Sequence, residues 1–169
     1  MADKTLFFAL WPSERQRELL RDTINPVLTT VEGTAVDRRN WHITLVYVGT
    51  FPEERIPGLL AAVDIIEPGN IRLRFDRLTF WQRPKIACLD VMTIPPELDR
   101  LVRSIEQALL PFGYTPQERT YRPHITAARK VRTFPPVRLT RAVELQWSDF
   151  ELVESISIRG DVQYRVLKQ

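Results

Sequence analysis

The chain of 169 residues contains two histidines, one cysteine and no long apolar run. A single cysteine, Cys88, cannot form an internal disulfide bond, which is typical of proteins in the reducing cytoplasm. No apolar stretch approaches the roughly 20 residues that span a bilayer. The apolar residues 6–10 are too few for the core of a signal peptide. We therefore expect a cytoplasmic protein that does not enter a membrane.

The chain also lacks any long block of charge of one sign. It carries 24 basic and 21 acidic side chains, a net charge of +3, and no segment resembles a nucleic-acid-binding tail. Arginine outnumbers lysine, and the guanidinium group is the better fork for phosphate oxygens. With 44% hydrophobic and 27% charged residues, the composition predicts one globular domain. It permits a phosphate-bearing partner without requiring one.

Local patterns of apolar residues predict a chain of both helices and strands. Helices are expected to begin at Ser13, Pro52 and Pro95. Ser13 and Gln16 form a capping box, and Pro26 should end or bend the first helix. In the strand over residues 40–49, the side chains of Ile43, Leu45 and Tyr47 should alternate with those of His42, Thr44 and Val46. Further strands are predicted over residues 5–10, 71–76, 85–92, 122–128, 137–147, 149–158 and 163–167.

Both histidines lie in the same tripeptide, His-Ile-Thr, at residues 42–44 and 124–126. Because residues i and i+2 of a strand point the same way, His42 should share a face with Thr44, and His124 with Thr126. One such tripeptide carries little weight, since most single histidines are surface or core residues. Two copies that use every histidine of the chain, both in predicted strands, favour one shared site.

The whole strand–helix–strand pattern around the histidines is repeated with a shift of 82 residues. The shift aligns residues 6–10 with residues 88–92 and the helix from Ser13 with the helix from Pro95. We therefore predict one domain over residues 1–169, made of two interleaved lobes with repeat units at roughly 4–50 and 85–130. An approximate twofold axis would bring one histidine from each lobe to a shared cleft.

Two imidazoles and two hydroxyls suit acid–base chemistry on a phosphate. One neutral and one protonated histidine form a general base and a general acid, and threonine hydroxyls donate hydrogen bonds to anionic oxygens. No Asp, Glu or Cys stands at ligand spacing beside either histidine, so we expect neither a metal site nor another cofactor.

With these motifs, the chain resembles the two-histidine (2H) phosphoesterase superfamily. Within it, the chain is most similar to the bacterial and archaeal RNA 2′,3′-cyclic phosphodiesterases, historically called 2′-5′ RNA ligases. The resemblance covers nearly the whole chain and rests on residues 6–10, 40–45, 49, 119–126, 129, 150–155, 160 and 164–167. The departures from the family pattern, at Thr5, Ala127 and Ala128, lie outside the proposed chemistry.

The resemblance implies a bilobal α+β fold in which helices back an antiparallel sheet in each lobe and the site lies in the cleft between them. It implies an enzyme that hydrolyses the 2′,3′-cyclic phosphate at an RNA end to a 2′-phosphate, and we expect this enzyme to be a monomer. His42 would be the general acid and His124 the general base, and the same groups could join RNA ends in reverse. Substrate would be bound by Thr44, Thr126, Arg129, Arg119, Tyr121 and Phe8.

Two other interpretations remain open at this point. The chain could be a 2H enzyme for another substrate, such as a small cyclic nucleotide, an ADP-ribose cyclic phosphate or an oligoadenylate. It could also be a module that binds RNA or nucleotides and has lost the chemistry, although intact histidines and threonines in both motifs argue against this. The exposed arginines predicted at 72 and 74 could follow an RNA backbone or be a solvated sheet face.

Overall fold

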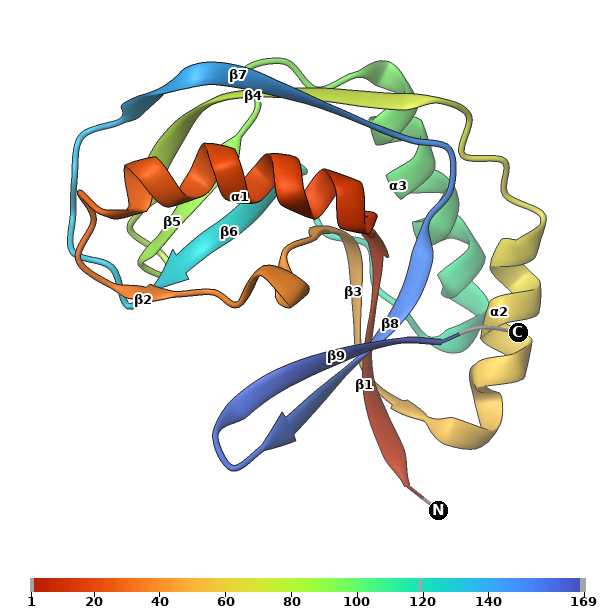
Figure 1. Cartoon of the computed structure of the whole chain (residues 1–169). Coiled ribbons are helices and arrows are strands. Elements are labelled where there is room, and N and C mark those ends of the chain that lie inside the picture. The colour runs from red at the N-terminus through yellow and green to blue at the C-terminus, as the bar shows by residue number, and fades with distance from the viewer. Residues whose placement is uncertain (1, 119, 168–169) are drawn as a thin grey trace.

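The computed structural model describes residues 2–118 and 120–167 (Figure 1). It is an α+β structure of two lobes, each built on an antiparallel sheet, as the sequence predicted. The four-stranded sheet has the order β3-β1-β8-β9, and the five-stranded sheet has the order β2-β6-β5-β4-β7. The predicted site residue Arg119 lies outside the described residues.

The strands and helices fall close to the predicted ranges. The four-stranded sheet consists of β1 (Asp3–Leu10), β3 (Ile43–Pro52), β8 (Glu151–Ile158) and β9 (Asp161–Leu167). The five-stranded sheet consists of β2 (Thr34–Ala35), β4 (Ile71–Trp81), β5 (Ile86–Asp90), β6 (His124–Arg129) and β7 (Val137–Trp147). The α-helices are α1 (Glu14–Leu28), α2 (Ile56–Asp64) and α3 (Pro96–Leu109), and short 3₁₀ turns are η1 (Arg38–Asn40), η2 (Glu53–Arg55) and η3 (Leu110–Phe112).

The start of α1 follows its sequence signal, and its end does not. The Ser13 hydroxyl accepts a hydrogen bond from the backbone N–H of Gln16, and the Gln16 side chain accepts one from the backbone N–H of Ser13, which confirms the capping box. The prediction that Pro26 ends or bends the helix is wrong in its first part, because α1 continues to Leu28. Pro26 lies in the last turn, where a missing backbone donor costs only one hydrogen bond.

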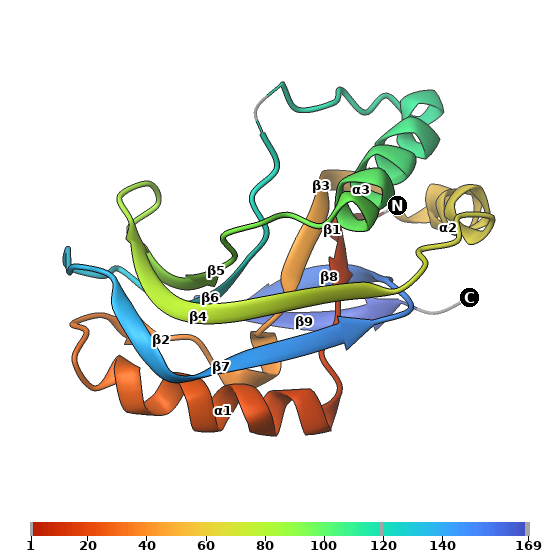
Figure 2. The ribbon, with the colours of Figure 1, turned by 90° about the horizontal axis from the view of Figure 1, so that it is seen from above.

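Each of the two longer helices, α1 and α3, packs against the sheet of the other lobe and not against the sheet that contains the strand before it. α1 follows β1 of the four-stranded sheet but packs against β7 and β6 of the other, and Figure 2 shows it running along β7. α3 follows β5 of the five-stranded sheet but packs against β3 and α2. The lobes are thus joined through their helices. None of the helices within the described residues is long and apolar enough to cross a membrane.

Extra residues in the two histidine-bearing strands change which side chains face the core. Phe8 pairs with Val46 and Ala9 with Thr44, so Leu45 is an extra residue in β3. Such a bulge reverses the alternation that follows it. Leu45 and Val46 are therefore both buried, while Tyr47 is 61% exposed. The predicted alternation of Ile43, Leu45 and Tyr47 is wrong for this reason.

The same event occurs in β6. Ala128 pairs with Ala87 and Thr126 with Cys88, which leaves Ala127 as the extra residue. Ala127 and Ala128 are both buried, and Arg129 is exposed. Arg129 consequently lies on the face of the sheet that carries Thr126. With strict alternation it would lie on the opposite face.

The strand pairing also corrects one part of the predicted repeat. Leu10 pairs with Ile43 just as Leu89 pairs with Ile125. Leu10 therefore corresponds to Leu89, three residues earlier than the shift of 82 implies. The difference arises because the connection from β5 to α3 is longer than that from β1 to α1.

Candidate active site

His42 lies directly before β3, where the chain leaves the turn η1. Its Nδ1 is 2.8 Å from the backbone oxygen of Asn40, and its Nε2 is 2.9 Å from Oγ1 of Thr44. The carbonyl oxygen can only accept, so Nδ1 carries the proton and donates it. In the neutral ring, Nε2 then accepts the hydrogen bond of the Thr44 hydroxyl.

His124 repeats this arrangement in the other lobe, as the first residue of β6. Its Nδ1 is 2.9 Å from the backbone oxygen of Arg122, again two residues before the histidine. Both rings are therefore held as the same tautomer, with the proton on Nδ1 and a lone pair on Nε2. β3 and β6 contact each other across the two lobes, which brings the two motifs to one place.

Aromatic rings surround His42. The ring centroids of Phe7, Trp11 and Tyr164 lie 4.8, 5.9 and 5.1 Å from that of His42. Burial and, to a smaller extent, the positive charges of His124, Arg129 and Arg17 lower the pKa of His42 to about 4, against the opposing effect of the hydrogen bond to Asn40. Within the described part of the chain, all the charges that act on this ring are cationic, so His42 is neutral near pH 7.

His124 has a different neighbourhood, with a carboxylate in it. Its backbone is paired with that of Asp90, a buried residue whose Oδ1 accepts a hydrogen bond of 3.2 Å from Nε of Arg77. Burial lowers the pKa of His124, the charges of Arg122 and Arg129 add to this, and Asp90 opposes it. The Trp81 ring lies 4.3 Å from the His124 ring, with the Arg122 guanidinium 4.0 Å above that indole.

Five of the predicted site residues come together in the structure. Thr44 and Thr126 are half-buried on the faces that carry His42 and His124. Arg129 acts electrostatically on both histidines, which places its charge beside the pair. Tyr47 occupies the position in β3 that Arg129 occupies in β6, five residues after the histidine, and was not predicted to face this side.

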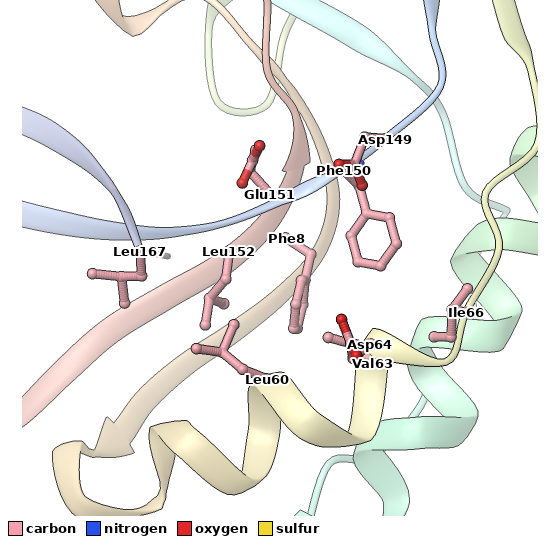
Figure 3. A pocket seen from close by; sticks show the side chains of 10 residues that line it. All are labelled: Phe8, Leu60, Val63, Asp64, Ile66, Asp149, Phe150, Glu151, Leu152 and Leu167. Carbon is pink, nitrogen blue, oxygen red and sulfur yellow. The ribbon is translucent and has the colours of Figure 1, made fainter. Parts of the chain in front are cut away.

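Phe8 does not lie with these residues, and its predicted place in the site is wrong. Its side chain is fully buried on the opposite face of β1. There it lines a cavity of about 260 Å³ together with Leu60, Val63 and Phe150 (Figure 3). Phe7 is the residue that contacts His42. Residues 6–10 are all apolar, so no polar residue shows which face of the strand meets the core and which meets the site. Alternation therefore could not distinguish Phe7 from Phe8.

Tyr121, predicted to stack on substrate, is half-buried and bonded to the other lobe. Its hydroxyl donates a hydrogen bond of 2.8 Å to the backbone oxygen of Thr44. Burial raises the pKa of Tyr121, so the hydroxyl keeps its proton. The residue ties the segment before β6 to the strand of His42.

Sequence reasoning missed Asp90 and Arg17 entirely. Asp90 stands at the end of a buried apolar strand, and only the pairing of β5 with β6 puts it beside His124. Arg17 is one of several arginines of α1 and is distinguished by being 3% exposed. Across residues 2–118 and 120–167, no three His, Cys, Asp or Glu side chains are grouped so that they could hold a metal ion.

The low pKa of His42 predicts that stability depends on pH. An unfolded histidine takes up its proton near pH 6.5, whereas folded His42 does so near pH 4. The unfolded state binds more protons between these values, so this stabilisation is complete above pH 6.5 and is lost as the pH falls towards 4. We expect urea unfolding to show about 2 kcal/mol more loss between pH 7.5 and 5 in the unaltered protein than in His42→Asn. Equal losses would contradict the assignment.

Comparisons with known proteins agree with this geometry. The sequence profile of the family described as LigT-like phosphoesterase matches residues 10–88. The RNA 2′,3′-cyclic phosphodiesterase of Escherichia coli K12 is 29% identical over 171 residues, covering 97% of this chain and 94% of the relative. That of Aeropyrum pernix is 28% identical over 160 residues, covering 88% and 90%. The crystal structure of E. coli LigT complexed with 3′-AMP has a TM-score of 0.83 at 25% identity, covering 99% and 97%.

A pair of His-x-Thr motifs facing each other from two antiparallel sheets defines a phosphoesterase of the 2H type. The chain is similar to the LigT-like phosphoesterases in sequence over residues 10–88 and in fold over nearly its whole length, and it is an enzyme.

Proposed function

We propose that the enzyme hydrolyses the 2′,3′-cyclic phosphate at an RNA end to a 2′-phosphate, without a metal ion. The observation that carries the proposal is the matched tethering of the two histidines. Each donates its Nδ1 proton to the backbone oxygen two residues earlier, so Nε2 is the ring atom that can exchange a proton. At His42, the bound phosphate would first take over the Thr44 hydroxyl from Nε2. The names of the E. coli and A. pernix relatives support this substrate.

In the proposed reaction, Nε2 of His124 takes a proton from water, and the water oxygen attacks phosphorus. The bond from phosphorus to the 3′ oxygen breaks, and Nε2 of His42, protonated once the anionic phosphate is bound, gives its proton to that oxygen. The hydroxyls of Thr44 and Thr126 donate to the non-bridging oxygens, while Arg129 offsets the negative charge that develops. The product keeps its phosphate on the 2′ oxygen. With a 5′-hydroxyl in place of water as the nucleophile, the same displacement of the 3′ oxygen would join two RNA ends through a 2′-5′ bond.

The different surroundings of the histidines support this division of roles. Asp90 stabilises the imidazolium that forms when His124 accepts a proton, as a buried aspartate does for the histidine of a serine protease. His42 has only cations around it, so once it is protonated beside the anionic phosphate it releases the proton readily. The exposed ring of Tyr47, on the same face as Thr44, offers a stacking surface for the base.

The proposal is tested with a synthetic RNA oligonucleotide that ends in a 2′,3′-cyclic phosphate, in buffer containing EDTA. We expect conversion to the 2′-phosphate, identified because it resists enzymes that remove only 3′-phosphates. Matched reactions with a nucleoside 2′,3′-cyclic phosphate, ADP-ribose 1″,2″-cyclic phosphate and 2′-5′ oligoadenylate show which substrate is preferred. Turnover of none of these, with tight binding of a 2′-phosphorylated nucleotide, would instead indicate a binding module.

A further inference from the structure

We propose that Arg17 is a positioning residue that holds His42 at its working place opposite His124. Arg17 contacts neither reacting group, so its effect on turnover would pass through His42. The expected effect on turnover rests on the proposed function, whereas the expected effect on the NMR titration of His42 rests on geometry alone.

The first step of the argument is the pair of backbone oxygens that Arg17 binds. Its guanidinium, almost completely buried, donates from Nη1 to the backbone oxygens of Arg38, at 2.6 Å, and Trp41, at 2.9 Å. These oxygens lie at the two ends of the turn that contains Asn40, the residue whose carbonyl accepts the Nδ1 proton of His42. One guanidinium therefore fixes the turn that orients the imidazole.

The second step is the ring that covers His42. The Cζ atom of Arg17 lies 4.9 Å from the centroid of the Trp11 ring, within the range of a cation–π contact. The Trp11 ring in turn stacks on His42 at an interplanar angle of 27°. The same side chain thus supports the imidazole from the backbone side and from the ring side.

The third step is that Arg17 reaches from one lobe to the other. It lies on α1, which packs against β6 and β7 of the sheet that carries His124, while the turn that it binds leads into β3 of the other sheet. The hydrogen bond from Tyr121 to the backbone oxygen of Thr44 crosses between the lobes in the same way. Catalysis by a histidine pair requires both rings at a fixed separation, and a misplacement of about 1 Å can cost about 10²-fold in rate.

If Arg17 only stabilised the fold, an arginine would be a poor residue at this position. Burying a charged guanidinium is costly, and burial lowers the pKa of Arg17. Among the described residues it forms no ion pair within 4 Å that would offset this cost. Its charge is one of those that act on His42, together with His124 and Arg129 of β6, and the Tyr164 ring of β9 packs against the same imidazole.

The test compares three variants with the unaltered protein: Arg17→Met, Arg17→Lys and the matched control Arg15→Met, an exposed position on the same helix. Turnover is measured with a nucleoside 2′,3′-cyclic phosphate. The rings of His42 and His124 are titrated by NMR, which is simple because the chain has no other histidine. The control should match the unaltered protein in both measurements.

We expect Arg17→Met to lower kcat by about 10- to 100-fold with KM changed less than about threefold. The midpoint of the His42 titration should rise, while that of His124 stays in place. Arg17→Lys keeps the charge but replaces the planar guanidinium, whose Nη1 binds both carbonyls while its Cζ lies over Trp11, with a compact ammonium on a different stem. It should therefore leave the His42 midpoint low and still lose kcat. If Arg17→Met does not fold, Arg17→Lys carries the test alone.

Two results would overturn the proposal. Variants of Arg17 that melt at a lower temperature but match Arg15→Met in kcat and in the His42 titration would show a purely structural residue. Equal movement of both histidine midpoints would show an effect on the whole fold. If the unaltered protein opens no cyclic phosphate, the proposed function fails, and the chemical shifts of the His42 ring protons in Arg17→Lys, compared with those of His124, still decide whether Arg17 positions that ring.

Discussion

Replacing His124 with alanine should lower kcat on a 2′,3′-cyclic phosphate end by about 10³-fold or more. The Nε2 atom of His124 would be the only group placed to take the proton from water, and general acid–base groups contribute about 10² to 10⁴ in rate. His42→Ala should cause a loss of the same order. The variant that lacks both histidines should be little worse than either alone, because residues that act as a unit are not additive.

Both variants should remain folded, which separates this expectation from simple damage. His42 and His124 are half-buried and each makes one local hydrogen bond to the backbone. Far-UV circular dichroism and thermal melting check this directly. Turnover by the double variant at the rate of the unaltered protein would contradict the mechanism.

The division of roles can be tested with a substrate in which sulfur replaces the 3′ oxygen. A thiolate leaves without being protonated, so a general acid is not needed for it. We expect the 3′-thio substrate to restore much of the activity of His42→Ala and none of that of His124→Ala. Restoration of His124→Ala instead would reverse the two roles.

Replacing Thr44 with valine should lower kcat by about 10²-fold, the second largest effect that we expect. Valine has the shape of threonine and lacks the hydroxyl, so the change removes a donor to the phosphate oxygen with little change in packing. Loss of one such donor costs about 10² to 10³ in rate in other enzymes. Thr126→Val should behave in the same way if the two lobes bind the phosphate symmetrically.

Thr44→Ser is the informative companion, since it keeps the hydroxyl and should retain most of the activity. Thr50→Val is the matched control, because Thr50 is exposed further along β3 and should give unchanged kinetics. The measurement is kcat and KM for the cyclic oligonucleotide with each variant. A loss in Thr44→Ser equal to that in Thr44→Val would show that the methyl group, and not the hydroxyl, matters.

Much of the local structure could be predicted because its signals lie in neighbouring residues. The β4 strand begins with Ile71, Leu73 and Phe75 alternating with exposed arginines, and the structure keeps that alternation. The helix predicted to begin at Pro95 is α3, and its apolar side chains recur at helical spacing and are buried. Such patterns depend on the period of a strand or helix, which the chain carries within a single segment.

The errors in the site have one common cause, which is the pairing of strands. Whether β3 and β6 contain an extra residue depends on the partner strand, so alternation alone placed Tyr47 on the wrong face. The choice between Phe7 and Phe8 depended on which face of β1 meets His42. Asp90 reached His124 only through the register of β5 with β6.

The sequence by itself determined that each histidine shares a face with a threonine, because residues two positions apart on a strand point the same way wherever that strand lies. Only the tertiary structure decided what surrounds each histidine. Burial and neighbouring charge depend on segments far apart in the chain, so two identical tripeptides acquired different environments. His42 lies among aromatic rings, above a turn that Arg17 holds in place, whereas His124 lies beside the carboxylate of Asp90.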